Sequence, residues 1–226
     1  MVRAVLFDVD FTLALPGPEL GPDGYRRVGE RHGLALDPRR YDEARAVALG
    51  SLQRDPELVH DDEVWTAFTE RIVRGMGGEG ETVAACAAEI VRTWELHDKF
   101  TLYDDALPVL RALRAHGLGI GLVSNGSRDL AEFVAHPGLV VDVAIGSRAF
   151  GRTKPHPSIF REALAALEVE PQEAAMVGDS YEDDIEGARA LGMRAFLLDR
   201  EERHPHEPER LTTLLALPAA LCLPAK

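Results

Sequence analysis

Two aspartates, Asp8 and Asp10, directly follow an apolar segment near the start of the chain, and Thr12 comes two positions later. The apolar run at residues 2–7 has the composition of a buried strand. Two carboxylates this close together repel each other, and burying either of them is costly unless a positive charge lies beside it. The rest of the sequence should therefore bring a positive charge to this place.

Other short apolar segments are also followed by polar side chains. These side chains are Ser124, Asn125, Lys154, Asp179, Asp183 and Asp184. Carboxylates suit a hard divalent cation such as Mg²⁺, whereas hydroxyls and the N–H groups of a helix start suit a phosphate. An attacking carboxylate, Mg²⁺ and a phosphate together indicate phosphoryl transfer through an aspartyl-phosphate.

An alternation of strands and helices is predicted to position these residues. Apolar runs predict strands at residues 3–8, 119–125, 140–146, 174–179 and 194–199, and apolar spacing predicts helices at 108–116, 158–169 and 181–191. Such alternation predicts an α/β fold with a Rossmann-like parallel sheet covered on both faces. In such a sheet, ligands bind beyond the carboxyl ends of the strands, where the polar residues lie. A further helix is expected to start near Ser127.

Residues 16–99 break this alternation. Aromatic, methionine and aliphatic residues recur there at helical spacing in four segments, which predicts four helices packed as a small bundle. We therefore expect a core domain of residues 1–15 and 100–226 with an inserted α-helical cap domain of residues 16–99. Residues 211–221 are expected to form an amphipathic helix that covers the core.

Four motifs occur in a fixed order: DVDFTL, SNGS, the lysine of TKPHPSIF, and GDSYEDDIEGA. In this the chain resembles the haloacid dehalogenase-like hydrolase superfamily, in the phosphoglycolate phosphatase-like branch with a helical cap inserted after the first motif. The resemblance implies the HAD-like fold over essentially the whole chain. The insert matches the branch in position and helical character, and it matches no motif.

The resemblance also implies roles for individual residues. Asp8 resembles the nucleophile, Asp10 the general acid and base, and Lys154 the residue that neutralises Asp8 and the transferring phosphoryl group. The implied phosphate-binding residues are Thr12, Ser124, Asn125 and Lys154. The implied Mg²⁺ ligands are Asp8, Asp10 through its backbone carbonyl, Asp179 and Asp184. Asp184 could bind the metal through water or orient Lys154, and the role of Asp183 stays open.

A Mg²⁺-dependent phosphatase acting on a small phosphorylated metabolite is the function that this pattern favours. A phosphomutase on the same core is the alternative, and a non-catalytic binding module is disfavoured because the main motif residues are present. Asp10 disfavours a dehalogenase, since a halide leaving group needs no proton. Phe11 departs from the small or polar residue usual at its position, and it either packs against neighbouring segments or narrows the substrate entrance.

The composition limits the partners of the chain. Its 226 residues carry a net charge of −13, which argues against nucleic acid or an anionic membrane surface as the main partner. The sequence has no apolar run of membrane-spanning length and no signal-peptide pattern. Its two cysteines match no metal-binding spacing, so we expect a cytoplasmic protein. We expect a monomer or homodimer that binds a small phosphorylated substrate.

Overall fold

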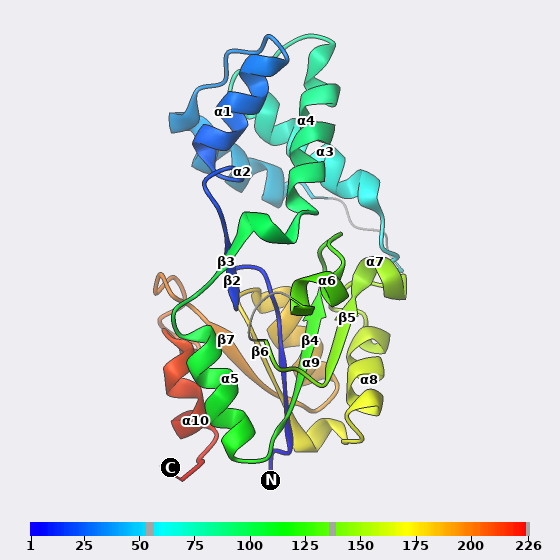
Figure 1. Ribbon diagram of the computed structural model, residues 1–226, viewed down its shortest axis with the longest axis vertical. Helices are drawn as coiled ribbons and strands as arrows, with labels where there is room; N and C mark the ends of the chain where they lie inside the picture. Colours follow the sequence, from blue (N-terminus) through cyan, green and yellow to red (C-terminus); the bar gives the residue numbers. More distant parts are fainter. Residues whose placement is uncertain (53–56, 136–138, 225–226) are drawn as a thin grey trace. The chain divides into compact units, whose positions relative to one another are not determined.

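The computed structural model describes residues 1–52, 57–135 and 139–224 (Figure 1). The chain divides into two compact units. Met1–Leu15 and Leu102–Lys226 form the first, called the α/β unit here, and Pro16–Thr101 form the second, called the helical unit. No helix in the described part of the chain is long and apolar enough to span a membrane.

Within the described residues, six parallel strands form the sheet of the α/β unit in the order β5-β4-β1-β6-β7-β8. They are β1 (Ala4–Phe7), β4 (Gly119–Ser124), β5 (Val143–Gly146), β6 (Ala174–Gly178), β7 (Arg194–Leu198) and β8 (Arg210–Leu211). The predicted α/β fold class with a parallel sheet is therefore confirmed. The chain adds strands first on one side of β1 and then on the other, so a topological switch point lies between β1 and β6, where ligands bind in such sheets.

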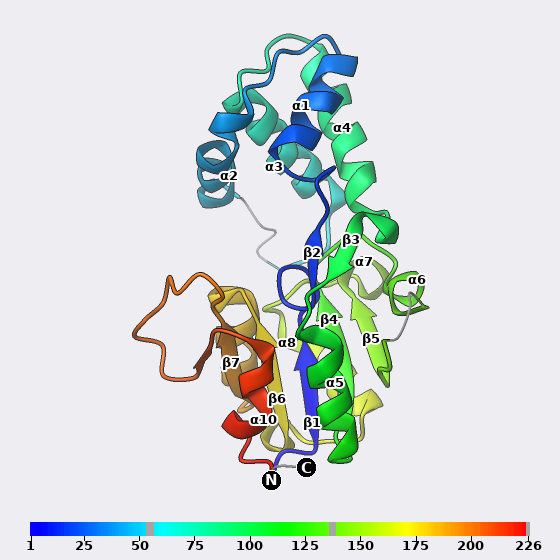
Figure 2. The same cartoon turned by 60° about the vertical axis from the view of Figure 1, so that its left-hand side comes forward.

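Helices and short turns join the strands of this sheet. They are α5 (Ala106–Ala115), α6 (Leu130–Ala135), α7 (Ser147–Phe150), α8 (Pro157–Ala166), η3 (Pro171–Glu173), η4 (Tyr181–Glu186), α9 (Gly187–Ala190), η5 (Leu214–Ala216) and α10 (Leu217–Ala220). Helices α5 and α10 lie side by side (Figure 2). The apolar face of α8 packs with η4 and α9 in one buried cluster that includes Leu6 of β1 and Met176 of β6.

Two expectations for this unit were wrong in detail. Helix α6 begins at Leu130 rather than near Ser127, because the Asp129 carboxylate accepts hydrogen bonds from the N–H groups of Ala131 and Glu132, as an N-cap does. The segment 211–221 is not one helix but contains the end of β8, η5 and α10. Leu214 and Leu217 are nevertheless fully buried there, so the segment does cover the core.

The helical unit contains four α-helices among its described residues, in the segments where helical spacing predicted them. They are α1 (Pro22–Arg31), α2 (Tyr41–Gly50), α3 (Asp62–Gly75) and α4 (Thr82–Trp94), with the short turns η1 (Pro38–Arg40) and η2 (His97–Lys99). Their apolar faces form a separate core in which the Tyr25 and Tyr41 rings meet edge to face at 5.1 Å. The chain passes between the units in β2 (Ala14–Pro16) and β3 (Phe100–Leu102), which pair with each other.

Candidate active site

A tight loop presents the residues that follow β1. The Asp8 N–H donates to the Val177 carbonyl at 2.9 Å, which anchors the loop to β6. The N–H groups of Leu13 and Ala14 both donate to the Val9 carbonyl at 2.9 Å. Phe11 completes the turn with a left-handed φ of 63°, a conformation that non-glycine residues adopt mainly where the surrounding structure imposes it. The sequence pattern did not predict this turn.

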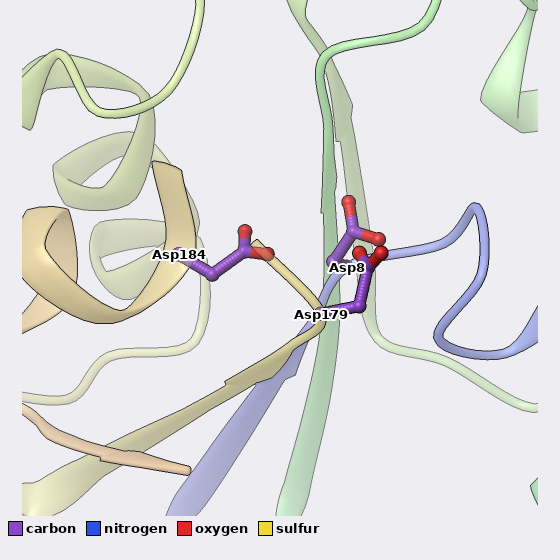
Figure 3. A group of neighbouring side chains, drawn as sticks. All are labelled: Asp8, Asp179 and Asp184. Atoms are coloured by element: carbon purple, nitrogen blue, oxygen red, sulfur yellow. The ribbon is translucent and has the colours of Figure 1, made fainter. Parts of the chain in front are cut away.

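Three carboxylates gather where β1 and β6 end. The side chains of Asp8, Asp179 and Asp184 each offer an oxygen, and these oxygens all lie within 4.8 Å of one another (Figure 3). Asp8 follows β1 and Asp179 follows β6, on the two sides of the switch point, while Asp184 comes from η4. Gly178 is required for this arrangement, because a Cβ at that position would lie only 2.1 Å from Asp184 Oδ2.

Lys154 supplies the positive charge that the two acids after β1 require. Its side chain is buried, and its Nζ donates to Asp8 Oδ1 at 2.6 Å and to Asp184 Oδ1 at 2.7 Å. The other oxygen of Asp184 accepts a hydrogen bond from the Ser180 N–H at 3.1 Å. Asp184 is therefore held against Lys154, which fits one of the two roles considered for it.

The electrostatics of this cluster are unbalanced, because three carboxylates, two buried and one partly buried, lie together with one ammonium group. Burial and the neighbouring Asp8 and Asp184 charges raise the pKa of Asp179 well above its usual value. Burial raises the pKa of Asp184 to about 7 despite the opposing effect of Lys154. For Lys154 burial acts against the charge, but Asp184 and Asp8 outweigh it and raise its pKa. The cluster has more negative charge than its own lysine balances.

Asn125 holds the backbone of Lys154. Its Oδ1 accepts from the Lys154 N–H at 2.6 Å, and its Nδ2 donates to the Lys154 carbonyl at 3.0 Å and to Asp183 Oδ2 at 3.3 Å. The side chain is thus committed to Lys154 and Asp183, and phosphate binding at Asn125 stays a prediction. Asp183 therefore lies beside Asn125 and is not one of the three aspartates of the carboxylate cluster.

The two hydroxyl residues differ in their surroundings. Ser124 is buried and its Oγ accepts from the Gly126 N–H at 3.2 Å, which leaves its own O–H as a donor. Thr12 is fully buried, and its Oγ1 has no hydrogen-bond partner among the described residues. The helix start expected near Ser127 is not available to a phosphate, since Asp129 caps α6.

Arg128 lies directly against Asp10, and sequence reasoning missed it. Its Nη2 donates to Asp10 Oδ1, and the Arg128 residue is only 4% exposed. Burial together with Asp8 raises the pKa of Asp10, although Arg128 opposes the rise. The Asp10 side chain therefore belongs to this pair and not to the cluster of Asp8, Asp179 and Asp184. In the sequence Arg128 lies four residues after Ser124, which does not distinguish it from a solvated surface arginine.

A second ion pair, between the buried Asp105 and the partly buried Arg200, supports the loop after β1 and was also missed from the sequence. Arg200 donates from Nη1 to Asp105 Oδ2 at 2.8 Å and from Nη2 to Asp105 Oδ1 at 2.9 Å. Its Nη2 also donates to the Thr12 carbonyl at 3.0 Å, and its guanidinium lies 3.8 Å from the centre of the Tyr103 ring. Arg200 thus ties the end of β7 to the backbone beside Asp10 and Thr12.

The carboxylate cluster fits a hard divalent cation. Its donors are all carboxylate oxygens, which Mg²⁺ prefers. The raised pKa values of Asp179 and Asp184 show that the ionised cluster is under-compensated in the protein. A dication there would offset the excess negative charge. His156 lies near Lys154 in the sequence but is not one of these carboxylate donors. It caps α8 by accepting a hydrogen bond from the Ser158 N–H.

Comparisons with known proteins agree with this fold. A family model described as haloacid dehalogenase-like hydrolase matches residues 2–192. Haloacid dehalogenase-like hydrolase domain-containing protein 3 of Bos taurus is 37% identical over 206 residues, which cover 87% of this chain and 82% of that protein. Glyceraldehyde 3-phosphate phosphatase of Methanopyrus kandleri is 32% identical over 223 residues, which cover 92% and 88%.

A solved structure extends the likeness to three dimensions. The crystal structure of a HAD phosphatase from Thermococcus onnurineus superposes with a TM-score of 0.67 at 29% identity, and the match covers 97% of this chain and 98% of that one. The family model spans the residues from β1 to α9 that carry all four motifs. The chain belongs to the haloacid dehalogenase-like hydrolase family.

Proposed function

We propose that the protein is a Mg²⁺-dependent phosphatase that hydrolyses a small phosphorylated metabolite through an aspartyl-phosphate on Asp8. The observation that carries this proposal is the buried Lys154 ammonium, 2.6 Å from Asp8 Oδ1, inside a carboxylate cluster that fits a divalent cation. The phosphatase name of the Methanopyrus kandleri relative supports a phosphate monoester as the substrate class.

In the first half of the reaction, an oxygen of Asp8 attacks phosphorus and the bond between phosphorus and the leaving oxygen breaks. Lys154 offsets the charge of Asp8 and of the incoming phosphoryl group, which lets two negatively charged groups approach each other. Asp10 gives its proton to the leaving oxygen, so that an alcohol departs. Ser124 and Thr12 are the hydroxyls that we assign to the phosphoryl oxygens.

In the second half, Asp10 removes a proton from a water molecule whose oxygen attacks phosphorus. The bond between phosphorus and Asp8 breaks, which regenerates the Asp8 carboxylate and releases inorganic phosphate. Asp10 is then protonated and ready for the next cycle, so the proton balance closes.

Asp8, Asp179, Asp184 and the Asp10 carbonyl are the groups that we expect to hold Mg²⁺, which would supply positive charge beside the phosphoryl oxygens. Asp184 and Asn125 position Lys154, one at its ammonium group and the other at its backbone. We assign to the helical unit the role of a cap domain, which supplies substrate specificity in the branch that the sequence resembles.

The test measures phosphate release from a panel of phosphorylated metabolites and from p-nitrophenyl phosphate, with Mg²⁺ and with EDTA. The wild type is compared with Asp8→Asn, which keeps the shape of the side chain and removes the nucleophile. We expect Mg²⁺-dependent release by the wild type and none above background by the variant. Glu162→Gln, on the exposed surface of α8, is the matched control and should keep full activity.

Two results would count against the proposal. The first is the absence of phosphate release from every ester by folded wild-type protein in Mg²⁺. The second is full activity in Asp8→Asn, which would move the nucleophile elsewhere. Equal rates in Mg²⁺ and in EDTA would remove the metal from the proposal.

A further inference from the structure

Arg128 is a buried cation whose position calls for a functional explanation. Arginine is almost never fully buried unless it is paired, and a buried ion pair seldom adds net stability over apolar packing. Its Nη2 donates to Asp10 Oδ1, and the side chain of Arg128 is 2% exposed whereas that of Asp10 is 23% exposed. The pair thus joins a deeply buried guanidinium to a carboxylate that reaches the surface of the α/β unit.

The surroundings of Arg128 hold it in place from several sides. Its guanidinium lies 5.0 Å from the centre of the Phe133 ring of α6, at cation–π distance. The loop before it is fixed because Arg148 of α7 donates to the Ser127 carbonyl at 3.0 Å. The guanidinium is therefore placed by Asp10 and Phe133, unlike that of a solvated surface arginine.

The same loop also lies against Asp10 directly. A Cβ at Gly126 would be 3.4 Å from Asp10 Oδ2 and 3.5 Å from Ser124 Oγ. One oxygen of Asp10 is thus fixed by Arg128, while the other lies next to the backbone that carries Ser124. Asp10 also follows Asp8 at a distance of two residues, and repulsion from Asp8 would favour rotation of an unpaired Asp10 side chain away from the cluster.

We propose that Arg128 is a positioning residue that holds the Asp10 carboxyl group in the orientation for proton transfer. This inference rests on the proposed function, in which Asp10 protonates the leaving oxygen and then deprotonates water. Arg128 acts through Asp10 and does not itself touch the phosphoryl group. Its importance therefore depends on how much the leaving oxygen needs a proton.

This dependence separates positioning of Asp10 from other roles of an arginine. An alkyl leaving group departs as a strongly basic alkoxide unless it is protonated, whereas p-nitrophenolate is a weak base and departs without a proton. The quotient kcat/KM includes only the steps up to departure of the leaving group. Loss of Arg128 should therefore lower kcat/KM strongly for an alkyl phosphate and little for p-nitrophenyl phosphate.

The experiment measures kcat/KM with Mg²⁺ for the best alkyl phosphate of the panel and for p-nitrophenyl phosphate. The variants are Arg128→Ala and Arg128→Met, with Asp10→Asn as the benchmark and Arg161→Ala on the exposed surface of α8 as the control. Because general acid–base catalysis typically contributes 10²–10⁴-fold, we expect a loss of about 100-fold for the alkyl ester in both Arg128 variants. The aryl ester should stay near the wild-type value.

Chemical rescue provides a second readout that a purely structural role would not give. Guanidinium ion at millimolar concentration should restore part of the alkyl phosphate activity of Arg128→Ala, and the same concentration of sodium chloride should not. Arg128→Met retains the apolar stem of the side chain, so it keeps the test valid if Arg128→Ala does not fold. Thermal melting of each variant confirms that the protein assayed is folded.

Equal losses for the two esters would overturn the inference and assign Arg128 to the phosphoryl group or to folding. Unchanged kinetics in both Arg128 variants would overturn it as well. Failure of the proposed function gives a different pattern, because wild-type protein would then release no phosphate from either ester. A third pattern would refute the inference about Arg128 and leave the proposed function intact. In it, the wild type is active and Asp10→Asn loses more activity on the alkyl ester than on the aryl ester, whereas the Arg128 variants show no such difference.

Discussion

Two buried charge networks lie in the α/β unit, and they are balanced very differently. In the first, which we call the carboxylate cluster, Asp8, Asp179 and Asp184 lie together and Lys154 pairs with Asp8 and Asp184. In the second, which we call the Asp105 network, one carboxylate accepts two hydrogen bonds from Arg200, one from the Thr213 hydroxyl at 2.7 Å and one from the Leu214 N–H at 3.0 Å.

The aspartate pKa values shift in opposite directions in the two networks. In the carboxylate cluster, burial and mutual repulsion raise the pKa of Asp179 and Asp184. For Asp105 burial also acts to raise the pKa, but the hydrogen bonds from Arg200, Thr213 and Leu214 outweigh it and lower the pKa. The fold thus supplies Asp105 with hydrogen-bond donors that outweigh its burial, and it leaves the carboxylate cluster short of positive charge.

This contrast separates a structural role from a functional one. Well-paired charges orient the segments that carry them, as Arg200 orients the Thr12 carbonyl. A cluster with excess negative charge costs stability in the free protein and becomes favourable only when a cation binds. Two aspartates of the same unit should therefore respond in opposite ways to the same substitution.

Asp105→Asn should give the largest change in stability. The variant leaves the Arg200 guanidinium without its anionic partner. Breaking a buried ion pair from one side typically costs about 3–5 kcal/mol, and we expect a loss at the lower end, about 3 kcal/mol, because the Arg200 side chain is 22% exposed. The free energy of unfolding of the α/β unit, measured by urea denaturation in EDTA, should fall by this amount. Glu162→Gln is the surface control, and an unchanged unfolding midpoint for Asp105→Asn would show that the Asp105 network contributes no stability.

Mg²⁺ should stabilise the wild type through the carboxylate cluster. A ligand at 100 times its Kd adds about 2.7 kcal/mol to the stability of the folded state. Scanning calorimetry should therefore show a higher Tm with MgCl₂ than with EDTA. Asp105→Asn should keep this Mg²⁺-dependent rise from its lower starting Tm, because the Asp105 network contributes no group to the cluster. Absence of the rise in the wild type would contradict the assignment of the metal to the cluster, and its loss in Asp105→Asn would show that the metal site depends on the loop that Arg200 supports.

Five of the described strands (β1, β4, β5, β6 and β7) and the carboxylate cluster could be predicted from the sequence because their signals are local, whereas the short strands β2, β3 and β8 were not predicted. Each of the five predicted strands is a short apolar run, and Asp8, Asp179 and Lys154 follow such runs or lie in a motif. The parallel topology then brings the strand ends together without knowledge of any particular contact. Asp184 was also found in this way, because its motif places it close behind Asp179.

The missed features depend on contacts between residues far apart in the chain. Arg128 and Asp10 are separated by 118 positions, and Arg200 and Asp105 by 95. Nothing in the local pattern distinguishes either arginine from a solvated surface residue. The start of α6 was misplaced for a local reason, since the capping role of Asp129 competes with an earlier start at Ser127. The use of the Asn125 side chain could not be predicted, because it depends on where the Lys154 backbone lies.

Asp179→Asn should give the smallest change and one of opposite sign to that of Asp105→Asn. The amide keeps the size of the side chain and removes one of the three negative charges of the cluster, so the ionised cluster loses part of its repulsion. Relief of a strained active site typically adds about 1 kcal/mol, which raises Tm by roughly 2–4 °C in a chain of this length. The rise should appear in EDTA, while the Mg²⁺-dependent rise of the wild type should largely disappear. A lower Tm in EDTA would mean that Asp179 is held by favourable contacts as Asp105 is, and the excess charge of the cluster would then no longer explain why a cation binds there.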